Sequence, residues 1–340
     1  MSSLNLFNLR SHALSDWLKE PSGGKLRLFV STSGYEKRAT EWIRRILAER
    51  HVLEADQFFV AGFEDFAGAL SRPTNNDFYA AVGLTIENCG SSRATTFTER
   101  LVARVDTLLA TATANDKIEI HIDYSCMPRR WYCGLPLLLE ERLRQHDRMF
   151  FWYTPGLYPE SGYPTAGTDD FKVFSGRASL SAKSRTHLFG LGFDRIRSQA
   201  IWSVLDPRNL VCFYADPAAD PSYVERVKKD NQEALDAAIY TFTVPVDDFA
   251  MTFSRIRSVV FQFRVLGDVV IVPDGPKPLV FASSLIPFTI EEVSGVVCFH
   301  VSKRKPANFI PVDVLSAGAP TGFSAGGKRE IAKVDAPAEQ

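Results

Sequence analysis

The feature that most constrains the fold is a pattern of residue types that occurs twice along the chain. Residues 26–47, "LRLFVSTSGYEKRATEWIRRIL", and residues 184–205, "SRTHLFGLGFDRIRSQAIWSVL", follow the same order. Each runs from an apolar, β-rich stretch through a glycine, an aromatic residue, an acid and an arginine into apolar residues at helical spacing. The triplet "GYE" at 34–36 thus corresponds to "GFD" at 192–194. Both segments predict a strand, a loop and a helix.

The elements that follow these two segments also match in order. "QFFVAGFED" at 57–65 corresponds to "NLVCFYADP" at 209–217, and "MFFWYTPG" at 149–156 corresponds to "VVCFHVSK" at 296–303. Between them, "KIEIHIDYSCMPRRWYCGLPLLLEE" at 117–141 corresponds to "DVVIVPDGPKPLVFASSLIPFTIEE" at 268–292. No single match is specific. However, these three matches and the first pair of segments occur in the same order, which indicates an internal duplication.

Strands that alternate with helices predict right-handed βαβ units and mostly parallel sheets. We therefore predict an α/β fold of two tandem Rossmann-like units related by internal duplication. The predicted boundaries are an N-terminal extension (1–24), a first unit (25–160), a linker (161–184), a second unit (185–316) and a tail (317–340). Because the tail is rich in small and polar residues and contains prolines, it is predicted to be disordered.

Composition narrows the class of protein. The 45% hydrophobic and 23% charged content is typical of a folded globular protein, and the net charge of -1 gives no global attraction to nucleic acid or anionic membranes. The five cysteines are scattered without a CxxC pair, which is typical of free thiols in a reducing compartment. No stretch approaches the ~20 apolar residues that span a bilayer. The expectation is a cytoplasmic protein that contacts no membrane and no nucleic acid.

Sequence motifs for common cofactors are missing. No two histidines show metal-ligand spacing and HExxH does not occur, so no metal is expected. Neither GxxxxGK[ST] nor GxGxxG occurs, so neither a P-loop ATPase nor an ordinary dinucleotide dehydrogenase is supported, and no cofactor is evident.

Candidate site residues follow the predicted strands, because ligands of open parallel sheets bind beyond the carboxyl ends of the strands. The candidates in the first unit are Ser33, Gly34, Tyr35, Glu36, Arg38, Asp123, Ser125, Arg129 and Arg130. Those in the second unit are Gly192, Asp194, Arg195, Arg197, Asp274 and Lys277. His300, near another strand end, is also placed where it could approach a ligand, whereas His121 within a strand is interpreted as structural.

These residue types suit a phosphate-bearing, nucleotide-like ligand. Glycine permits positive φ and close backbone approach, the N–H groups of a following helix can bind an anion, and arginine holds phosphate through two parallel hydrogen bonds. An acid such as Glu36 or Asp194 could accept a hydrogen bond from a ribose hydroxyl, or it could simply anchor the arginine. The structural alternative is that the glycines serve turns, the acids cap helices and Arg129 and Arg130 are solvated. However, a first helical turn disfavours cations unless an anion is near, which favours a ligand.

The segment at 25–47 resembles two Rossmann-like groups. One is the ligand-sensing domains of CRISPR-associated and related prokaryotic defence proteins, whose strand-end loops bind a cyclic oligonucleotide at a pseudo-symmetric interface. This resemblance places Ser33 to Arg38 in the first loop and Ser125 to Arg130 in the later one. The other is the NAD-cleaving Toll/interleukin-receptor-like domains. Those domains rely on a glutamate on a later helix, for which Glu64 and Glu99 are candidates here.

Three functions remain open at this point. The first is a sensor or accessory protein that binds a nucleotide-like ligand between two halves, with a role in bacterial antiphage defence implied by the resemblance, and with a homodimer or an effector protein as partner. The second is a hydrolase that cleaves NAD or a cyclic nucleotide with Asp123 or Glu36 as acid or base. The third is a protein-interaction scaffold without a small ligand.

Overall fold

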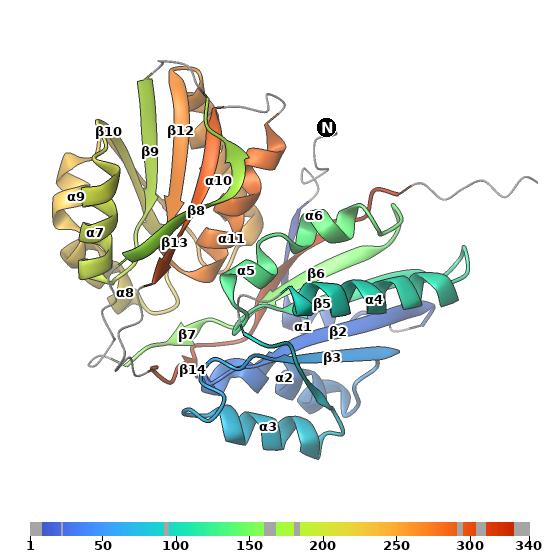
Figure 1. Cartoon of the computed structure of the whole chain (residues 1–340). Helices are drawn as coiled ribbons and strands as arrows, with labels where there is room; N and C mark the ends of the chain where they lie inside the picture. Colours follow the sequence, from blue (N-terminus) through green and yellow to red (C-terminus); the bar gives the residue numbers. More distant parts are fainter. Residues whose placement is uncertain are drawn as a thin grey trace, which may run out of the picture.

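The structure is a computed structural model that describes residues 9–21, 23–91, 95–159, 168–179, 184–290, 295–303 and 311–329 (Figure 1). Parts of the predicted linker, at 161–167 and 180–183, and of the predicted tail, at 330–340, lie outside these residues. Two α/β units lie against each other, the first drawn mainly in blue to green and the second in yellow to orange.

The first sheet has the strand order of a Rossmann fold. Its parallel strands lie in the order β4-β3-β2-β5-β6, so the order reverses between β2 and β5. They are β2 (Lys25–Ser33), β3 (Gln57–Gly62), β4 (Ile86–Asn88), β5 (Lys117–Asp123) and β6 (Arg148–Tyr153). Leu28 and Phe29 on β2 are buried on opposite faces of the sheet, which explains the uninterrupted apolar runs of the sequence.

The second sheet repeats this order. Its parallel strands lie in the order β11-β10-β9-β12-β13, with the reversal between β9 and β12. They are β9 (Ser184–Gly190), β10 (Asn209–Ala215), β11 (Tyr240–Val244), β12 (Gly267–Pro273) and β13 (Val296–Lys303). The predicted fold class is therefore confirmed: the chain forms two Rossmann-like units with mostly parallel sheets, and the shared strand order matches the repeat in the sequence.

Helices cover both faces of each sheet. In the first unit they are α2 (Glu41–Arg50), α3 (Arg72–Ala81), α4 (Thr96–Thr111), α5 (Arg129–Tyr132) and α6 (Leu135–Glu140), with a 3-10 turn η2 (Lys37–Thr40) before α2. In the second they are α7 (Arg195–Leu205), α8 (Pro221–Asp230), α9 (Gln232–Ala237), α10 (Phe249–Arg264) and α11 (Lys277–Leu285), followed by η3 (Ile286–Thr289). One hydrophobic cluster runs from α4 through the junction to α10 and α11, so the two units share a core.

The two units also exchange strands. After β6 the chain forms β7 (Gly156–Leu157) and then β8 (Thr168–Arg177), which joins the second sheet antiparallel to β13. After β13 it forms β14 (Leu315–Ser316) and then β15 (Thr321–Gly326), which joins the first sheet antiparallel to β6. β7 and β14 pair with each other where the two crossings meet (Figure 1).

This exchange corrects the predicted boundaries. Residues 168–177 of the predicted linker are a strand of the second sheet, and 321–326 of the predicted disordered tail are a strand of the first. The N-terminal extension supplies β1 (Arg10–Ala13), which pairs with β15, and α1 (Leu14–Trp17). These segments are short or glycine-containing and gain their order from pairing with distant strands, which local sequence patterns do not reveal.

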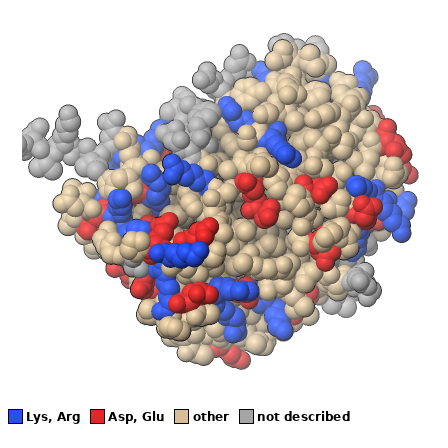
Figure 2. Space-filling view, turned by 180° about the vertical axis from the view of Figure 1, so that it is seen from behind, with Lys and Arg blue, Asp and Glu red and all other residues tan. Residues whose placement is uncertain are grey.

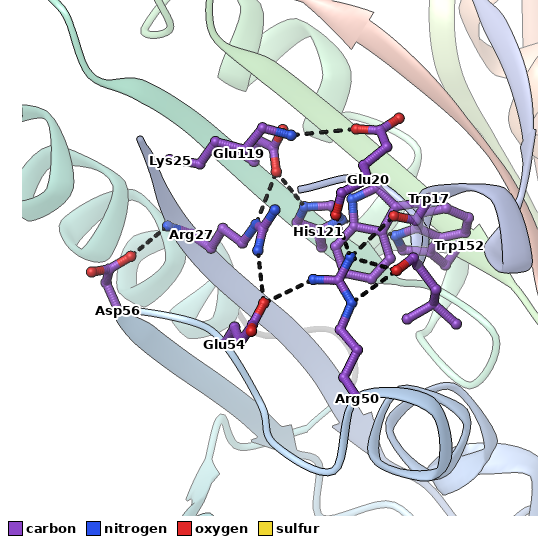
Figure 3. A network of polar contacts seen from close by, with 11 residues as sticks. Trp17, Glu20, Lys25, Arg27, Arg50, Glu54, Asp56, Glu119, His121 and Trp152 are labelled. Carbon is purple, nitrogen blue, oxygen red and sulfur yellow. Dashed lines mark hydrogen bonds and ion pairs between the residues drawn. The ribbon is translucent and has the colours of Figure 1, made fainter. Parts of the chain in front are cut away.

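A polar network ties the N-terminal segment to the first sheet (Figure 3). Arg27 on β2 donates to Glu119 on β5 at 2.9 Å, and Arg50 on α2 donates to the carbonyl oxygen of Leu18 at 2.9 Å. The His121 ring stacks on Phe150 at 4.5 Å and accepts a hydrogen bond from Trp152 Nε1 at 3.2 Å. His121 is therefore a core residue, in agreement with the structural interpretation.

Candidate functional site

A cavity of about 420 Å³ lies where the carboxyl ends of both sheets face each other. Its walls include the loops after the first and fourth strands of each unit, that is, after β2, β5, β9 and β12. The two points of strand-order reversal, where open α/β sheets bind ligands, therefore open into one space. The crossing segments around β7 and β14 also line it, through Gly156, Tyr158, Val312 and Val314.

The cavity brings together more than half of the residues predicted from sequence. Those that line it are Gly34, Tyr35, Glu36, Arg129, Arg130, Gly192, Asp194, Asp274, Lys277 and His300. The remaining candidates, Ser33, Arg38, Asp123, Ser125, Arg195 and Arg197, are not part of its lining. Ligand binding by the first group stays a prediction. In the second group, Ser33 Oγ donates to Asn76 Oδ1 at 2.7 Å, and the places of the other five are given below.

Gly34 and Gly192 are required for close packing rather than for positive φ. A Cβ on Gly34 would lie 2.9 Å from Cβ of Cys126, and one on Gly192 would lie 2.7 Å from the carbonyl oxygen of Asp274. Neither glycine is among the residues with positive φ. In each unit the glycine after the first strand thus lets that loop approach the loop after the fourth strand. This corrects the expectation that these glycines are needed for positive φ or for a turn.

Arg38 and Arg197 are buried structural residues in equivalent places. Arg38 Nε donates to Glu36 at 2.7 Å and its Nη1 donates to the carbonyl oxygen of Thr154, just after β6, at 2.7 Å. Arg197 Nε donates to Asp274 at 2.6 Å and its Nη2 donates to the carbonyl oxygen of Val301 on β13. Each arginine joins the first-strand loop to the end of the fifth strand. Both side chains are 1% exposed, so their predicted contact with a ligand has no support in the structure.

Two further cations, one from each unit, bond to backbone carbonyl oxygens of the other unit across the junction between the units. Lys277, the first residue of α11, donates from Nζ to the carbonyl oxygens of Ser125 at 2.6 Å, Met127 at 2.8 Å and Tyr124 at 3.3 Å. Arg129, the first residue of α5, donates from Nη2 to the carbonyl oxygen of Gly275 at 3.3 Å. Burial lowers the pKa of Lys277 to about 8, so the ammonium form still prevails at neutral pH.

The carboxylate of Asp123 is buried beneath the cavity wall. It accepts hydrogen bonds from the backbone N–H of Ser125 at 3.0 Å and from the Ser125 hydroxyl, and Ser125 Oγ accepts from the backbone N–H of Thr154 at 2.8 Å. Burial raises the pKa of Asp123 to about 6, and the bonds from Ser125 partly offset that rise. Both residues thus fix the loop after β5 in place.

The helix N-terminus after β9 is closed by its own cap. The Asp194 side chain accepts from the backbone N–H of Arg197 at 3.2 Å, which occupies one of the donors that an anion would need. Arg195, the first residue of α7, is exposed outside the cavity. The capping alternative raised for the acids is therefore correct for Asp194.

Aromatic side chains form another part of the cavity, and of those named here only Tyr35 was among the sequence candidates. Tyr158, Phe193 and Tyr223 contact one another, with Phe193 5.4 Å from each of the other two ring centroids. On the other side, Tyr35 meets Phe66 edge to face at 5.5 Å. Phe66 follows β3, so extending the strand-end argument to the second strand of that unit would have found it.

Cys126 and His300 are uncharged members of the wall. Burial raises the pKa of the Cys126 thiol well above its usual value, so it is not an activated nucleophile. His300 stacks on Phe174 at 4.6 Å. Burial and the nearby Arg129 and Arg130 lower the pKa of His300 to about 3, so its ring is neutral at physiological pH.

Beyond the cavity, three further kinds of feature bear on function: charged surface patches, metal sites and membrane-spanning helices. On the face in Figure 2, basic and acidic side chains are interspersed, and no band of one sign crosses it. Across the described ranges, no group of three histidine, cysteine or acidic residues is placed to hold a metal ion. None of the helices in those ranges combines the length and apolarity that crossing a membrane requires.

Comparison with known proteins leaves the family open. No family model matches the chain, and no curated protein matches it. Among solved structures, a match is found to the adenylation, ketoreductase and pseudo-Asub multidomain structure of a keto acid-selecting NRPS module, at 7% identity and a TM-score of 0.23. It covers 83% of this chain, which spans 30% of the matched chain. A TM-score of that size supports no inference about function.

Proposed function

We propose that the cavity binds a phosphate-bearing, nucleotide-like ligand between the two units, and that the protein is a sensor or accessory protein. The observation that carries this proposal is the convergence of the loops of Gly34, Arg129 and Gly192 on one cavity. Three loops that lie far apart in sequence meet at the place where this fold binds ligands.

The size and the lining of the cavity support such a ligand. A volume of about 420 Å³ lies within the range of small-molecule sites. Arg129 and Arg130 supply guanidinium groups for phosphate, and Tyr35 and Phe193, at equivalent positions of the two units, supply aromatic surfaces on which a base can stack. Polar groups therefore lie beside flat apolar ones, as a nucleotide requires.

A sensor role is better supported than catalysis. Of the two catalytic candidates, Asp123 is buried behind Ser125, and Glu36 is paired with Arg38 at 2.7 Å. Neither carboxylate is placed as a base poised to accept a proton from a substrate. A ligand held by both units would instead favour one arrangement of the units over others, which is the basis of sensing. The resemblance to ligand-sensing domains suggests prokaryotic defence as the setting.

Thermal stabilisation by nucleotides tests this proposal. The protein is mixed with mono-, di- and cyclic nucleotides and with NAD, and unfolding is followed by fluorescence. We expect a rise in Tm with at least one ligand, and loss of that rise in the Arg129→Ala/Arg130→Ala double variant. Arg195→Ala, which removes an exposed arginine outside the cavity, is the matched control and keeps the rise. No rise with any ligand would instead support the scaffold, and product formation from NAD or a cyclic nucleotide would support the hydrolase.

A further inference from the structure

A second, smaller cavity of about 180 Å³ lies within the second unit. Its walls come from α7, from the end of α8 and from the start of α9, which Figure 1 shows on the side of the second sheet away from the first unit. We call it the helical cavity, to distinguish it from the cavity between the units.

Two buried polar atoms belong to residues of this wall. Ser198 on α7 is 4% exposed, and Asn231 between α8 and α9 is 3% exposed. Ser198 Oγ and Asn231 Oδ1 are both buried without a hydrogen-bond partner among the described residues. Because an unsatisfied buried polar atom is costly, a group that bonded to these atoms from within the cavity would be held there favourably.

The orientation of the Asn231 amide is fixed by its other end. Its Nδ2 donates to the carbonyl oxygens of Gly192 at 2.8 Å and of Val227 at 2.8 Å, so both N–H donors are used. The first unit has the same arrangement, since Asn75 on α3 donates to the carbonyl oxygen of Gly34 at 2.9 Å. Asn231 and Asn75 are therefore equivalent, and Asn231 is left with an acceptor only.

The first unit supplies a hydroxyl group at the equivalent place. Four residues after its asparagine, the buried Tyr79 donates to the carbonyl oxygen of Ala39 at 2.9 Å. In the second unit the residue four positions after the asparagine is Leu235, which carries no hydroxyl, and Ser198 follows the buried arginine as Ala39 does in the first unit. The contact that a tyrosine makes in one unit is thus missing from this part of the other.

The size of the helical cavity limits what it can hold. A cavity of about 150 Å³ holds one benzene ring, so one of about 180 Å³ has room for a single ring with a polar substituent, and not for a nucleotide. Trp202 on α7 is half-buried in the wall, where its indole can pack against such a ring.

Charge in the wall is balanced. The charged residues among the described lining are Arg195, Lys229, Asp230 and Glu233, two of each sign. Their neighbours Arg226, which pairs with Asp230 at 3.5 Å, and Asp236, which accepts from Gln232 at 2.7 Å, add one charge of each sign. A balanced wall favours an uncharged ligand over a phosphate or an ammonium group.

We propose that the helical cavity is a second binding site, for an uncharged one-ring molecule with an amide-like edge. In such an edge an N–H donor lies beside a carbonyl oxygen. The N–H would donate to Asn231 Oδ1, and the hydroxyl of Ser198 would donate to the carbonyl oxygen. This inference goes beyond the proposed function and does not depend on it, because the two cavities are lined by different residues.

Ligand-detected NMR titration tests the inference with uracil and nicotinamide, which both carry this edge on one ring. The controls are 1,3-dimethyluracil and N,N-dimethylnicotinamide, in which methyl groups replace the N–H donors. We expect uracil or nicotinamide to bind with a Kd of about 1 mM or tighter, and its methylated analogue to bind at least about fivefold more weakly.

Variants place the bound molecule in the helical cavity. Ser198→Ala should weaken binding about fivefold while the protein stays folded, because the hydroxyl has no partner among the described residues. Leu235→Tyr, which gives the second unit the tyrosine of the first, should abolish binding. Ser254→Ala is the matched control, since Ser254 is exposed on α10, and should leave the Kd unchanged.

Three outcomes would overturn the inference. Binding that Ser198→Ala leaves unchanged would place the molecule elsewhere, and equal binding of a methylated analogue would remove the amide-like edge from recognition. No binding by either compound would mean that the helical cavity holds water only. The proposed function would stand in each case, because it is tested by nucleotides at the other cavity.

Discussion

Arg129 and Lys277 stand at equivalent positions of the two units and reach across the junction in opposite directions. Lys277 Nζ donates to the carbonyl oxygen of Ser125 at 2.6 Å, and Arg129 Nη2 donates to that of Gly275 at 3.3 Å. The loops that line the cavity are thus held together by one cation from each unit, the shorter contact coming from the lysine.

Replacing Lys277 should therefore weaken the junction. Lys277→Met keeps the apolar stem but leaves the carbonyl oxygens of Ser125 and Met127 without this donor. We expect a loss of about 2–4 kcal/mol in the free energy of unfolding, measured by urea titration at pH 7. Lys172→Met is the matched control, because its side chain is 51% exposed in a surface pair with Asp170, and should change stability by less than about 0.5 kcal/mol. Equal effects of the two variants would contradict the role given to Lys277.

The exchanged strand β15 makes a second testable contribution to the junction. Phe323 on β15 stacks on Phe249 of α10 at 3.7 Å and on Phe151 of β6 at 5.0 Å, so one side chain contacts both units. Phe323→Ala should cost about 3–5 kcal/mol of stability. Phe261→Ala, whose ring is 40% exposed on α10, is the control and should cost far less. A small effect at Phe323 would mean that β15 is dispensable for the fold.

The alternation of strands with helices and the loops at the strand ends could be predicted from sequence, because they depend on local patterns. Apolar runs of parallel strands and the repeated "GYE" and "GFD" triplets are visible without a structure. The strand exchange could not, since β15 is stabilised by pairing with β6, which lies far away in sequence. Likewise, the sequence placed Arg38 and Arg130 in one class of candidates. Only burial separates the structural arginine from the one at the cavity.

The network of Figure 3 predicts loss of stability in acid. Burial lowers the pKa of His121 to about 4, below its value of about 6.5 in an unfolded chain. The unfolded chain therefore takes up the proton first, so the contribution of His121 to stability is complete above pH 6.5 and falls by about 3 kcal/mol as the pH drops towards 4. The lowered pKa of Glu119 adds to the loss below pH 4.5. Urea titrations across this range check the slope, which should be shallower in His121→Gln.

Asp123 should act in the opposite direction over part of that range. Burial raises its pKa to about 6, so its contribution to stability is present below about pH 4 and is lost as the pH rises through 6. Asp123→Asn removes this opposing term, so the variant should lose up to about 3 kcal/mol more than the wild type between pH 6 and 4. Because Asp123 is not part of the cavity lining, ligand affinity at pH 7.5 should stay within about twofold. A large loss of affinity would instead show that Asp123 contributes to ligand binding.

The central claim, that the cavity between the units is the ligand site, is tested most directly by filling it. Ala219 lines the cavity after β10, and Ala219→Trp adds bulk there without removing any charge, whereas Ala237→Trp adds the same bulk at an exposed position on α9. Both variants and the wild type are titrated calorimetrically with the nucleotide that gives the largest thermal shift. We expect no measurable heat for Ala219→Trp and wild-type affinity for Ala237→Trp. Wild-type affinity in Ala219→Trp would show that the ligand binds elsewhere and would contradict the account.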